Sequence, residues 1–295
     1  MPATLARSPR ARRFRVLLLD WYASTARSLP WRETTDPYRV LVSEVMLQQT
    51  QVSRVEPLYR AFLDRFPTVA DLAAASTADV LTMWRGLGYN RRALNLRRAA
   101  QAVVEWHGGQ VPADLAALRA LPGIGDYTAR ALLAFAFGHE AAPVDVNVAR
   151  VLARAVAGAP LGRVAAQALA DATVPPGEAC AWGNALMDLG AQVCTARSPR
   201  CAECPVATAC AWRKAGGEDP AAASVARARP QGTFAGSDRF HRGRLVDALR
   251  TGPVARTALA DAAQLDDGER LARIVGGLVA DGLAQWAGDD LRLPA

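Results

Sequence analysis

The feature that most constrains the fold of this chain is a short loop that holds four of its five cysteines. Residues 194–210 read CTARSPRCAECPVATAC, and this C-x6-C-x2-C-x5-C spacing is tight enough for four thiolates to converge on one metal centre. Disulfide pairs are the alternative, and they are disfavoured in a chain that shows no secretory signal. Four thiolates suit either tetrahedral zinc or a [4Fe–4S] cluster, and ligand chemistry alone does not choose between the two.

A centre held by four protein ligands keeps no open coordination position, so we expect it to be structural rather than catalytic. It would hold the intervening loop, with Arg197 and Arg200, as a rigid basic edge for phosphate contacts. The fifth cysteine, Cys180, lies on a helical run and is expected to be a buried, small apolar side chain. The three histidines are scattered along the chain and form no ligand set.

The charge balance favours a polyanionic partner. The chain has 35 basic and 28 acidic residues, a formal charge of +7 and a pI of about 9.6, so nucleic acid is the first candidate. Lys214 is the only lysine, and the remaining basic residues are arginines. The apolar run at residues 16–19 stops at Asp20, too short for the core of a signal peptide, and no stretch is long enough to span a bilayer. We therefore expect a cytoplasmic bacterial protein, associated with the nucleoid through DNA and without a membrane partner.

Apolar residues recur at helical spacing almost throughout residues 11–212, with Gly or Pro at the joints. This pattern predicts an all-α region without strands. The expected helices span residues 12–27, 37–49, 53–65, 69–74, 77–84, 90–106, 114–119, 127–137, 147–156, 163–172 and 178–190.

The composition also predicts how the chain is divided. Residues 1–214 are expected to form one region, and residues 215–236, rich in Gly, Pro and Ala, to form a linker. Residues 237–295 show three helical segments followed by QWAGDDLRL, which resembles two short strands around a Gly-Asp-Asp turn. This order suggests a winged-helix-like module, which either binds DNA or only packs against its neighbour.

Residues 121–130, LPGIGDYTAR, predict a turn that exposes backbone amides. A glycine can adopt positive φ or let a ligand approach the backbone closely, so Gly123 and Gly125 can turn their N–H groups outward together and bind an anion. An ordinary turn between two helices is the alternative.

With the hairpin and the cysteine loop together, residues 11–212 resemble the helix-hairpin-helix DNA glycosylases that carry an iron–sulfur cluster, and within them the MutY-type adenine glycosylases. The motifs that carry the resemblance occur in the family's order: LPWR, SEVMLQQTQV, GLGY, LPGIGDYTA, VDVNVARV, ALMDLGAQVC and the cysteine spacing. The resemblance implies an all-α helix-hairpin-helix glycosylase fold. It also implies a [4Fe–4S] cluster with four cysteine ligands, Cys194, Cys201, Cys204 and Cys210.

The resemblance implies a function for the hairpin and a consequence of the absence of a lysine beside it. Gly123 and Gly125 would bind a DNA phosphate, with a monovalent cation at the hairpin. Bifunctional relatives place a Schiff-base lysine where this chain has Tyr127, and Lys214 lies far from the hairpin in sequence. We therefore expect a glycosylase that releases the base and does not cut the strand. A packed aromatic is the structural alternative for Tyr127.

Asp145 matches the family's catalytic aspartate, which stays ionised and stabilises the oxocarbenium ion of the sugar, and Asn147 would help to orient this chemistry. From the residues alone, Asp145 is also a favoured N-cap for the helix that follows, and the two roles are compatible. Val146 stands where the family commonly has Gly, a departure in the local backbone.

Glu44, in SEVMLQQTQV, matches the glutamate that protonates N7 of the extruded adenine. It must keep its proton near neutral pH, which calls for an enclosed apolar setting; a solvated helix face is the alternative. A base inside a duplex has to be flipped out to reach it, and by resemblance Gln48 and Tyr89 fill the gap in the stack. The residues expected to line the base pocket are Trp31, Arg32 and Asp188. Core packing is the alternative for Trp31 and Tyr89.

The expected function is that of a monomeric repair glycosylase acting on duplex DNA with A:8-oxoguanine or A:G mispairs. Typical members carry a C-terminal Nudix-like domain that reads 8-oxoguanine, and residues 237–295 do not resemble that fold, so the preference between opposing bases stays open. One rival is a thymine or uracil mismatch glycosylase, against which Glu44 argues. The other is a non-catalytic iron–sulfur redox regulator that binds DNA, which would need neither Glu44 nor Asp145.

Overall fold

The computed structural model of the chain describes residues 2–224 and 232–295. By packing, the described residues form two compact units. One contains residues 2–40, 113–119 and 125–224, and the other contains residues 41–112, 120–124 and 232–295. Residues 225–231 of the expected linker lie outside the described part of the chain. No helix among the described residues combines the length and the apolar character that crossing a bilayer requires.

Within the described residues, all the regular elements of the first unit are helices. Its elements are α1 (Pro2–Ala6), α2 (Pro9–Thr25), η1 (Pro30–Arg32), α8 (Leu115–Ala120), α9 (Asp126–Phe135), α10 (Val146–Val151), the π-helical turn η2 (Leu152–Ala157), α11 (Arg163–Thr173), α12 (Ala179–Gln192), η3 (Ala207–Ala209) and α13 (Ala211–Ala215). Ser8 caps α2 and Pro9 occupies its first position, which explains where this helix begins. In the core, the Phe14 ring meets the Trp182 ring edge-on at 5.8 Å, which joins α2 to α12.

The helices of the second unit begin with α3, which starts in the first unit and enters the second at Leu41. They are α3 (Pro37–Leu47), α4 (Val52–Arg65), α5 (Val69–Ala74), α6 (Thr77–Met83) and α7 (Arg91–His107). Thr68 and Asp71 form a capping box at the start of α5. Phe62 lies between Phe66 and Trp84, with ring centroids 4.9 and 6.0 Å apart, and these three rings form the centre of the unit's core.

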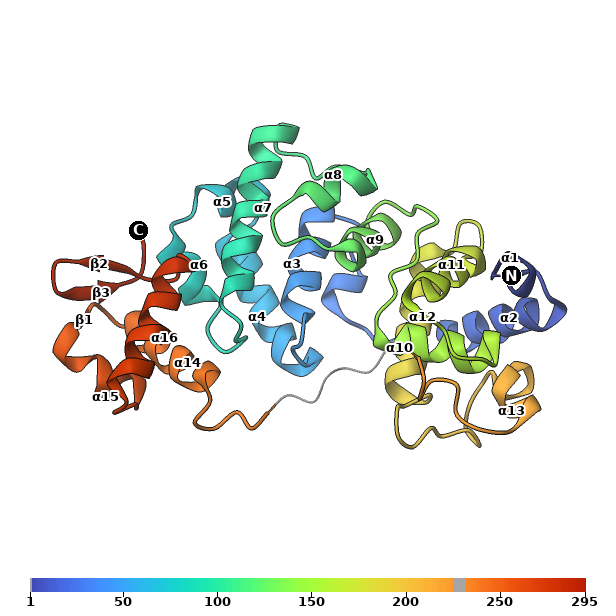
Figure 1. Cartoon of the computed structure of the whole chain (residues 1–295). Helices are drawn as coiled ribbons and strands as arrows, with labels where there is room; N and C mark the ends of the chain where they lie inside the picture. The colour runs from blue at the N-terminus through green and yellow to red at the C-terminus, as the bar shows by residue number, and fades with distance from the viewer. Residues whose placement is uncertain (1, 225–231) are drawn as a thin grey trace. The chain divides into compact units, whose positions relative to one another are not determined.

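The second unit also contains the C-terminal module. Its elements are α14 (Asp238–Leu249), β1 (Val254–Ala255), η4 (Arg256–Ala258), α15 (Leu259–Ala263), α16 (Gly268–Ala280), β2 (Gln285–Ala287) and β3 (Asp290–Arg292). The strands form an antiparallel sheet in the order β1-β3-β2, in which Leu291 pairs with both Val254 and Trp286. Figure 1 shows this sheet beside α14, α15 and α16, the arrangement of a winged helix. The predicted winged-helix-like module is confirmed.

The predicted all-α fold of residues 11–212 is also confirmed, with helix ends that differ by a few residues from the expected spans. Four short elements were not predicted: α1, η1, η3 and α13. Strand β1 was missed as well, because two residues carry no alternating pattern.

Candidate active site and iron–sulfur loop

Asp145 precedes helix α10 and is held there by three N–H donors. Its Oδ1 accepts from the backbone N–H groups of Asn147 at 2.9 Å and Val148 at 2.7 Å, and its Oδ2 accepts from Asn147 Nδ2 at 2.8 Å. The N-cap role predicted from the sequence is confirmed. Val146 is 42% exposed, so the side chain that replaces the family's glycine does not crowd the cap. The carboxyl group is therefore fixed in place before any substrate arrives.

Asn147 and Arg150 connect this carboxyl group to the cysteine loop. Arg150, which is 8% exposed, donates from Nη2 to Asn147 Oδ1 at 2.8 Å and from Nε to the carbonyl oxygen of Cys194 at 2.8 Å. The same Nη2 donates to Gly190 O at 2.7 Å. A Cβ on Gly190 would lie 2.8 Å from Asn147 Cβ, so only glycine lets α12 approach α10 this closely. One hydrogen-bonded chain thus runs from Asp145 to the first cysteine of the loop.

Asp188 on α12 is 1% exposed and binds two arginines. Arg32 donates to its two oxygens at 2.8 and 2.9 Å, and Arg27 donates through Nε to Oδ1 at 2.9 Å. Burial alone would raise the pKa of Asp188, but the hydrogen bonds from Arg32 and Arg27 hold that pKa below its ordinary value. The structure therefore brings together two of the predicted pocket residues, Arg32 and Asp188, and adds Arg27.

Replacing Asp188 with Asn is expected to lower the free energy of unfolding by about 3 kcal/mol, because two arginines lose a buried counter-charge. Removing the exposed partner of Arg39 in Asp36→Asn should change it by less than about 1 kcal/mol. Because the folded-state pKa of Asp188 is lowered, its stabilisation is complete above about pH 4 and is lost as the pH falls through the lowered value. Urea unfolding from pH 8 to pH 5 should therefore give a constant difference between parent and variant; a difference near zero would contradict the assigned role.

Tyr127 lies in the first turn of α9, where its hydroxyl donates to Met187 Sδ at 3.6 Å. Its side chain is half-buried, and the only lysine of the chain, Lys214, belongs to α13. Trp31, expected in the base pocket, is 7% exposed on η1. The start of α9 thus carries a phenol and no amine.

Glu44 lies on α3 and is 7% exposed, so the expected enclosure of this carboxyl group is observed and the solvated-face alternative is wrong. Gln48 follows the end of the same helix. Arg92 of α7 caps that end, because its Nη1 donates to the carbonyl oxygens of Val45, Met46 and Gln48 at 2.8, 2.9 and 2.5 Å. Burial lowers the pKa of Arg92 to about 10.

The GLGY loop, residues 86–90, is held by the same arginine. Arg92 Nη2 donates to Leu87 O at 3.0 Å and to Gly88 O at 3.1 Å. Tyr89 has φ +46° and is 40% exposed, an unusual combination for a large aromatic residue. Arg92 therefore fixes both segments that were predicted to enter the base stack, the one after α3 and the GLGY loop.

The two hairpin glycines differ in conformation. Gly123 has φ +77°, and a Cβ there would lie 2.6 Å from Asn95 Cβ, so this position requires glycine. Gly125 has φ −89° and ψ 177° as the N-cap of α9, and a Cβ there would meet no atom within 4 Å. Within the described residues, nothing in the protein's own packing requires glycine at 125.

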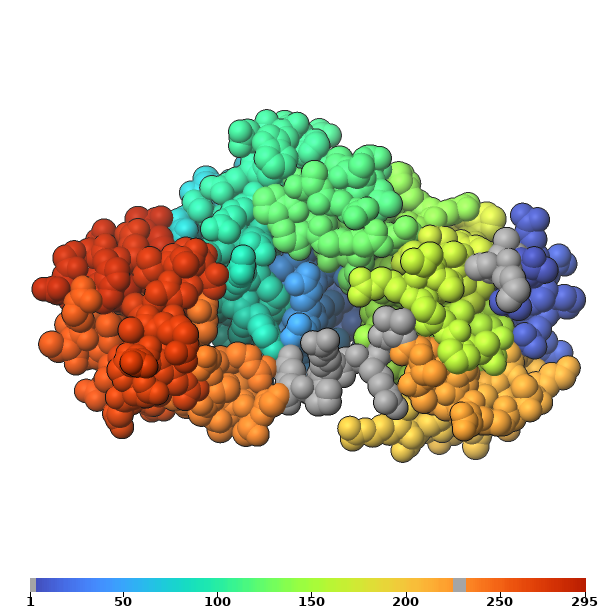
Figure 2. All heavy atoms as spheres, viewed as in Figure 1, coloured from blue at the N-terminus to red at the C-terminus, as the bar shows by residue number. Residues whose placement is uncertain are grey.

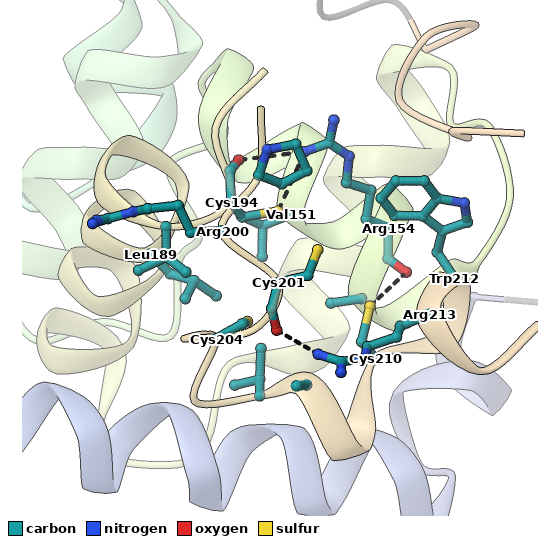
Figure 3. Close-up of a pocket in the computed structure, with 15 residues that line it drawn as sticks. Val151, Arg154, Leu189, Cys194, Arg200, Cys201, Cys204, Cys210, Trp212 and Arg213 are labelled. Carbon is teal, nitrogen blue, oxygen red and sulfur yellow. Dashed lines mark hydrogen bonds between the residues drawn. The ribbon is translucent and has the colours of Figure 1, made fainter. Parts of the chain in front are cut away.

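The four cysteines of the loop line one pocket (Figure 3). All are free thiols, so the disulfide alternative is wrong. Among the described residues, no three His, Cys, Asp or Glu side chains lie close enough together to hold a single metal ion. Four thiols around one pocket supply the ligand set that a [4Fe–4S] cluster uses.

Arg154, which is 1% exposed, holds the loop from inside. It donates to Cys194 Sγ at 3.5 Å and to Thr195 O at 2.7 Å, and its Nη2 forms an ion pair with Asp219 at 2.6 Å. Its guanidinium lies 5.2 Å from the ring centroid of Trp212 (Figure 3). Burial of Arg154 opposes its charge, but the hydrogen bonds to Asp219 and Cys194 outweigh it and raise the pKa.

Arg197, Arg200 and Cys180 lie in or near the cysteine loop, and the structure shows their surroundings. Arg197 is exposed, but Arg200 turns its guanidinium to Gln192 O and also pairs with Glu203 at 3.3 Å. The expectation that Cys180 is buried is wrong: the residue is exposed on α12. Its place on an apolar helix suggested burial, but the apolar stripe of α12 faces the core from other positions.

Arg92, Arg150 and Arg154 were not predicted from the sequence. Arg150 stands three residues after Asn147 on a helix, a spacing that could have indicated the side-chain pair. Arg92 and Arg154 bind mainly backbone carbonyls from segments far away in sequence, and no local pattern signals such contacts.

Comparison with known proteins agrees with this geometry. A family model for HhH-GPD superfamily base excision DNA repair proteins matches residues 42–162, and a model for the iron–sulfur binding domain of endonuclease III matches residues 194–210. An adenine DNA glycosylase of Mycolicibacterium smegmatis is 46% identical over 285 residues, covering 93% of each chain. The human adenine DNA glycosylase is 42% identical over 215 residues, which cover 68% of this chain and 39% of the human protein.

Two solved structures are similar to the chain. A thermostable thymine-DNA glycosylase is 29% identical, with a TM-score of 0.64 that covers 71% of this chain and 100% of the other. Endonuclease III trapped covalently on DNA gives a TM-score of 0.59 at 23% identity, which supports the fold alone.

The hairpin between α8 and α9 and the cysteine loop behind the capped aspartate define a helix-hairpin-helix DNA glycosylase of base excision repair, with an iron–sulfur binding loop. Within that superfamily the high identity to curated relatives, which extends over nearly the whole chain, is decisive. The chain belongs to the adenine DNA glycosylase family.

Proposed function

We propose that this enzyme removes adenine from duplex DNA in which the adenine faces 8-oxoguanine or guanine, by hydrolysis and without cutting the strand. The observation that carries the proposal is the enclosure of Glu44: a carboxyl group 7% exposed, in a chain whose relatives are adenine DNA glycosylases. A second carboxyl group, Asp145, is held at the start of α10. Two carboxyl groups in unlike settings can divide the roles of acid and anion.

In the proposed mechanism the adenine is flipped out of the stack at a cost of a few kcal/mol. Gln48 and Tyr89 fill the gap that it leaves, and Arg92 keeps both segments in place. The buried acid Glu44 gives a proton to N7 of the base, which turns adenine into a better leaving group. Asp145 then stabilises the positive charge that develops on the sugar as the bond between C1′ and the base breaks, and Asn147 keeps its carboxyl group in orientation. Water adds to C1′ and releases a proton, which leaves the abasic sugar.

The remaining predicted residues have supporting roles in this proposal. Trp31 and Arg32 line the base pocket, and Asp188 acts through Arg32, because both of its oxygens are engaged by arginines. The amides at Gly123 and Gly125 bind a backbone phosphate, with a monovalent cation at the hairpin. Arg197 and Arg200 add phosphate contacts from the loop. The enzyme acts as a monomer.

The cofactor in this proposal is a [4Fe–4S] cluster. The four loop cysteines would hold it, and Arg154 and Arg150 would fix the loop around it. When bound, the cluster would cross-link the loop between α12 and α13, and no step of the proposed reaction requires it. The groups that act on the adenine nucleotide in this proposal are therefore side chains of the protein and not the cluster.

The proposal predicts that duplexes with A opposite 8-oxoguanine or G lose adenine and leave an abasic site that breaks only after alkali. Tyr127 offers no amine for a Schiff base, so borohydride should trap no enzyme–DNA adduct. The measurement is single-turnover base release with and without alkali, with endonuclease III as the adduct-forming control. Breakage without alkali would contradict the hydrolytic mechanism.

A second candidate has one observation in its favour. The thermostable thymine-DNA glycosylase aligns over its whole length with this chain. Duplexes with T or U opposite G therefore belong in the same assay. Release of those bases, with adenine left in place, would replace the adenine proposal with the mismatch-glycosylase alternative.

A further inference from the structure

The C-terminal module is hydrogen-bonded to α6 and to the GLGY loop. Arg250, which follows α14, has a side chain that is 4% exposed, and it donates to Leu81 O at 2.8 Å and to Asn90 Oδ1 at 3.0 Å. At the other end of the module, Pro294 O accepts from Ala78 N at 3.0 Å. Figure 2 shows the orange-to-red surface of the module in contact with the teal surface of the segment that contains α6. Because Asn90 belongs to the GLGY loop, the module has a fixed position at that loop.

Two exposed aromatic rings and a half-buried arginine lie at this junction. Arg239 at the start of α14 donates from Nη1 to Tyr89 OH at 3.2 Å and from Nη2 to Gly232 O at 3.0 Å. The Phe234 ring, 59% exposed, lies 6.0 Å from the Arg239 guanidinium. Two exposed aromatic rings, Phe234 and Tyr89, thus flank one arginine. Flat rings beside a guanidinium are the groups on which nucleobases stack.

The rest of the module is less suited to contact DNA. Winged helices that read duplex DNA do so with the helix that corresponds to α16. Here α16 is preceded by Asp266 and Asp267 and has Glu269 in its first turn, and Arg270 is paired with Asp238 at 2.6 Å. These carboxylates would face phosphates of the same sign, which argues against groove reading by α16.

We propose that Phe234 and Arg239 form the binding site for the base that lies opposite the excised one. The inference rests on the proposed function, in which Tyr89 enters the stack at the flipped adenine. The base opposite that adenine then lies next to Tyr89, and Tyr89 is hydrogen-bonded to Arg239. The C-terminal module therefore reads the opposing base from its fixed position at the GLGY loop.

The chemistry of the pair fits a guanine-type base. A guanidinium donates to two adjacent acceptors at once, and guanine presents such a pair, O6 and N7, on its major-groove edge. In 8-oxoguanine N7 carries a proton, but O6 and O8 are acceptors on either side of it, so the guanidinium can donate to one of them. The Phe234 ring offers an apolar face on which a purine can stack. Pyrimidines have a smaller face and lack the paired acceptors, so they are expected to bind this site less well.

The test uses the full chain and duplexes with an uncleavable 2′-fluoro-2′-deoxyadenosine opposite 8-oxoguanine, guanine or an abasic spacer. The variants are Phe234→Ala, Arg239→Ala and Tyr89→Phe, which keeps the ring but removes the hydroxyl that Arg239 contacts. The matched control is Arg244→Ala, because Arg244 is exposed on the same helix α14 and makes no hydrogen bond or ion pair with the described residues. Dissociation constants are measured at one salt concentration, since affinity for DNA depends on salt.

Phe234→Ala and Arg239→Ala should each weaken binding opposite 8-oxoguanine by about tenfold and leave binding opposite the abasic spacer unchanged. Tyr89→Phe should give a smaller loss, and Arg244→Ala none. An equal loss on all three duplexes would make Arg239 a phosphate contact and overturn the inference, as would no loss at all. Adenine release by the parent protein from the cleavable duplexes is measured alongside. If the parent releases no adenine, the proposed function is wrong. If the parent releases adenine but the variants bind all duplexes as tightly as the parent does, only the proposed site for the opposing base is wrong.

Discussion

Replacing Glu44 with Gln is expected to slow adenine release by about 100- to 10,000-fold, because the amide cannot give a proton to N7 of the leaving base. Asp145→Asn is expected to slow it by about 100- to 1,000-fold, because the charge that stabilises the sugar cation is gone. Single-turnover rates on an A:8-oxoguanine duplex measure both effects, since slow product release does not obscure the chemical step.

The structure makes Asp145→Asn a specific test of charge. Asn is as good an N-cap as Asp, and its side-chain oxygen can still accept from the backbone N–H groups of Asn147 and Val148. The new amide NH2 loses the hydrogen bond that Oδ2 accepts from Asn147 Nδ2, so stability should fall by about 1 to 2 kcal/mol, while the rate falls far more. A matched control for Glu44→Gln is Glu56→Gln, because the Glu56 side chain is 41% exposed and, among the residues that the structure describes, forms an ion pair only with Arg60 at 3.8 Å. Parental rates in both active-site variants would exclude the proposed mechanism.

The part of the fold that sequence reasoning predicted is the part in which local signals and packing agree. The spans of the long helices followed from apolar spacing, and Asp145 was placed as an N-cap because its short acidic side chain precedes an apolar helix. The cysteine loop could be predicted because four thiols within residues 194–210 leave few other uses. The nature of the cluster and the role of Glu44 came from the resemblance, because spacing alone left both open.

The arginine contacts could not be predicted. Arg92, Arg150 and Arg154 look alike in sequence to the many arginines on the surface, because an arginine that binds a carbonyl oxygen leaves no pattern in its neighbours. Their partners become visible only when α3, α12 and the cysteine loop are folded around them. The prediction that Cys180 is buried was wrong for a different reason. Its apolar helix suggested burial, but helical periodicity does not decide which residues at the edge of the apolar stripe remain exposed.

The attachment of the C-terminal module has a similar explanation. The winged-helix pattern in residues 237–295 was readable, but Arg250 alone binds both Leu81 O and Asn90 Oδ1, more than 150 residues earlier in the chain. Contacts at such separation depend on the tertiary fold and not on any local motif. The relation between the module and the GLGY loop is therefore new information from the structure.

The Arg154–Asp219 pair is expected to decide whether the iron–sulfur loop stays closed. Arg154 is almost fully buried, and Asp219 is its carboxylate partner at 2.6 Å. Asp219→Ala would leave a buried charge without its partner, at a cost of about 3 kcal/mol. Because Arg154 also binds Cys194 Sγ and Thr195 O, its displacement would loosen the first cysteine of the loop. We expect the parent to retain about four irons per chain and the variant to lose iron several-fold faster in air.

The control for this loss lies in the same loop. Glu203→Ala removes the partner of Arg200 in an exposed ion pair with N···O at 3.3 Å, which contributes at most about 1 kcal/mol. Its iron content and melting temperature should match those of the parent. Asp219→Asn separates charge from geometry, because the amide oxygen can still accept from Arg154, and it should retain more iron than Asp219→Ala. Equal iron retention in Asp219→Ala and Glu203→Ala would show that the loop closes without this pair, and stoichiometric zinc in natively purified protein would exclude the cluster itself.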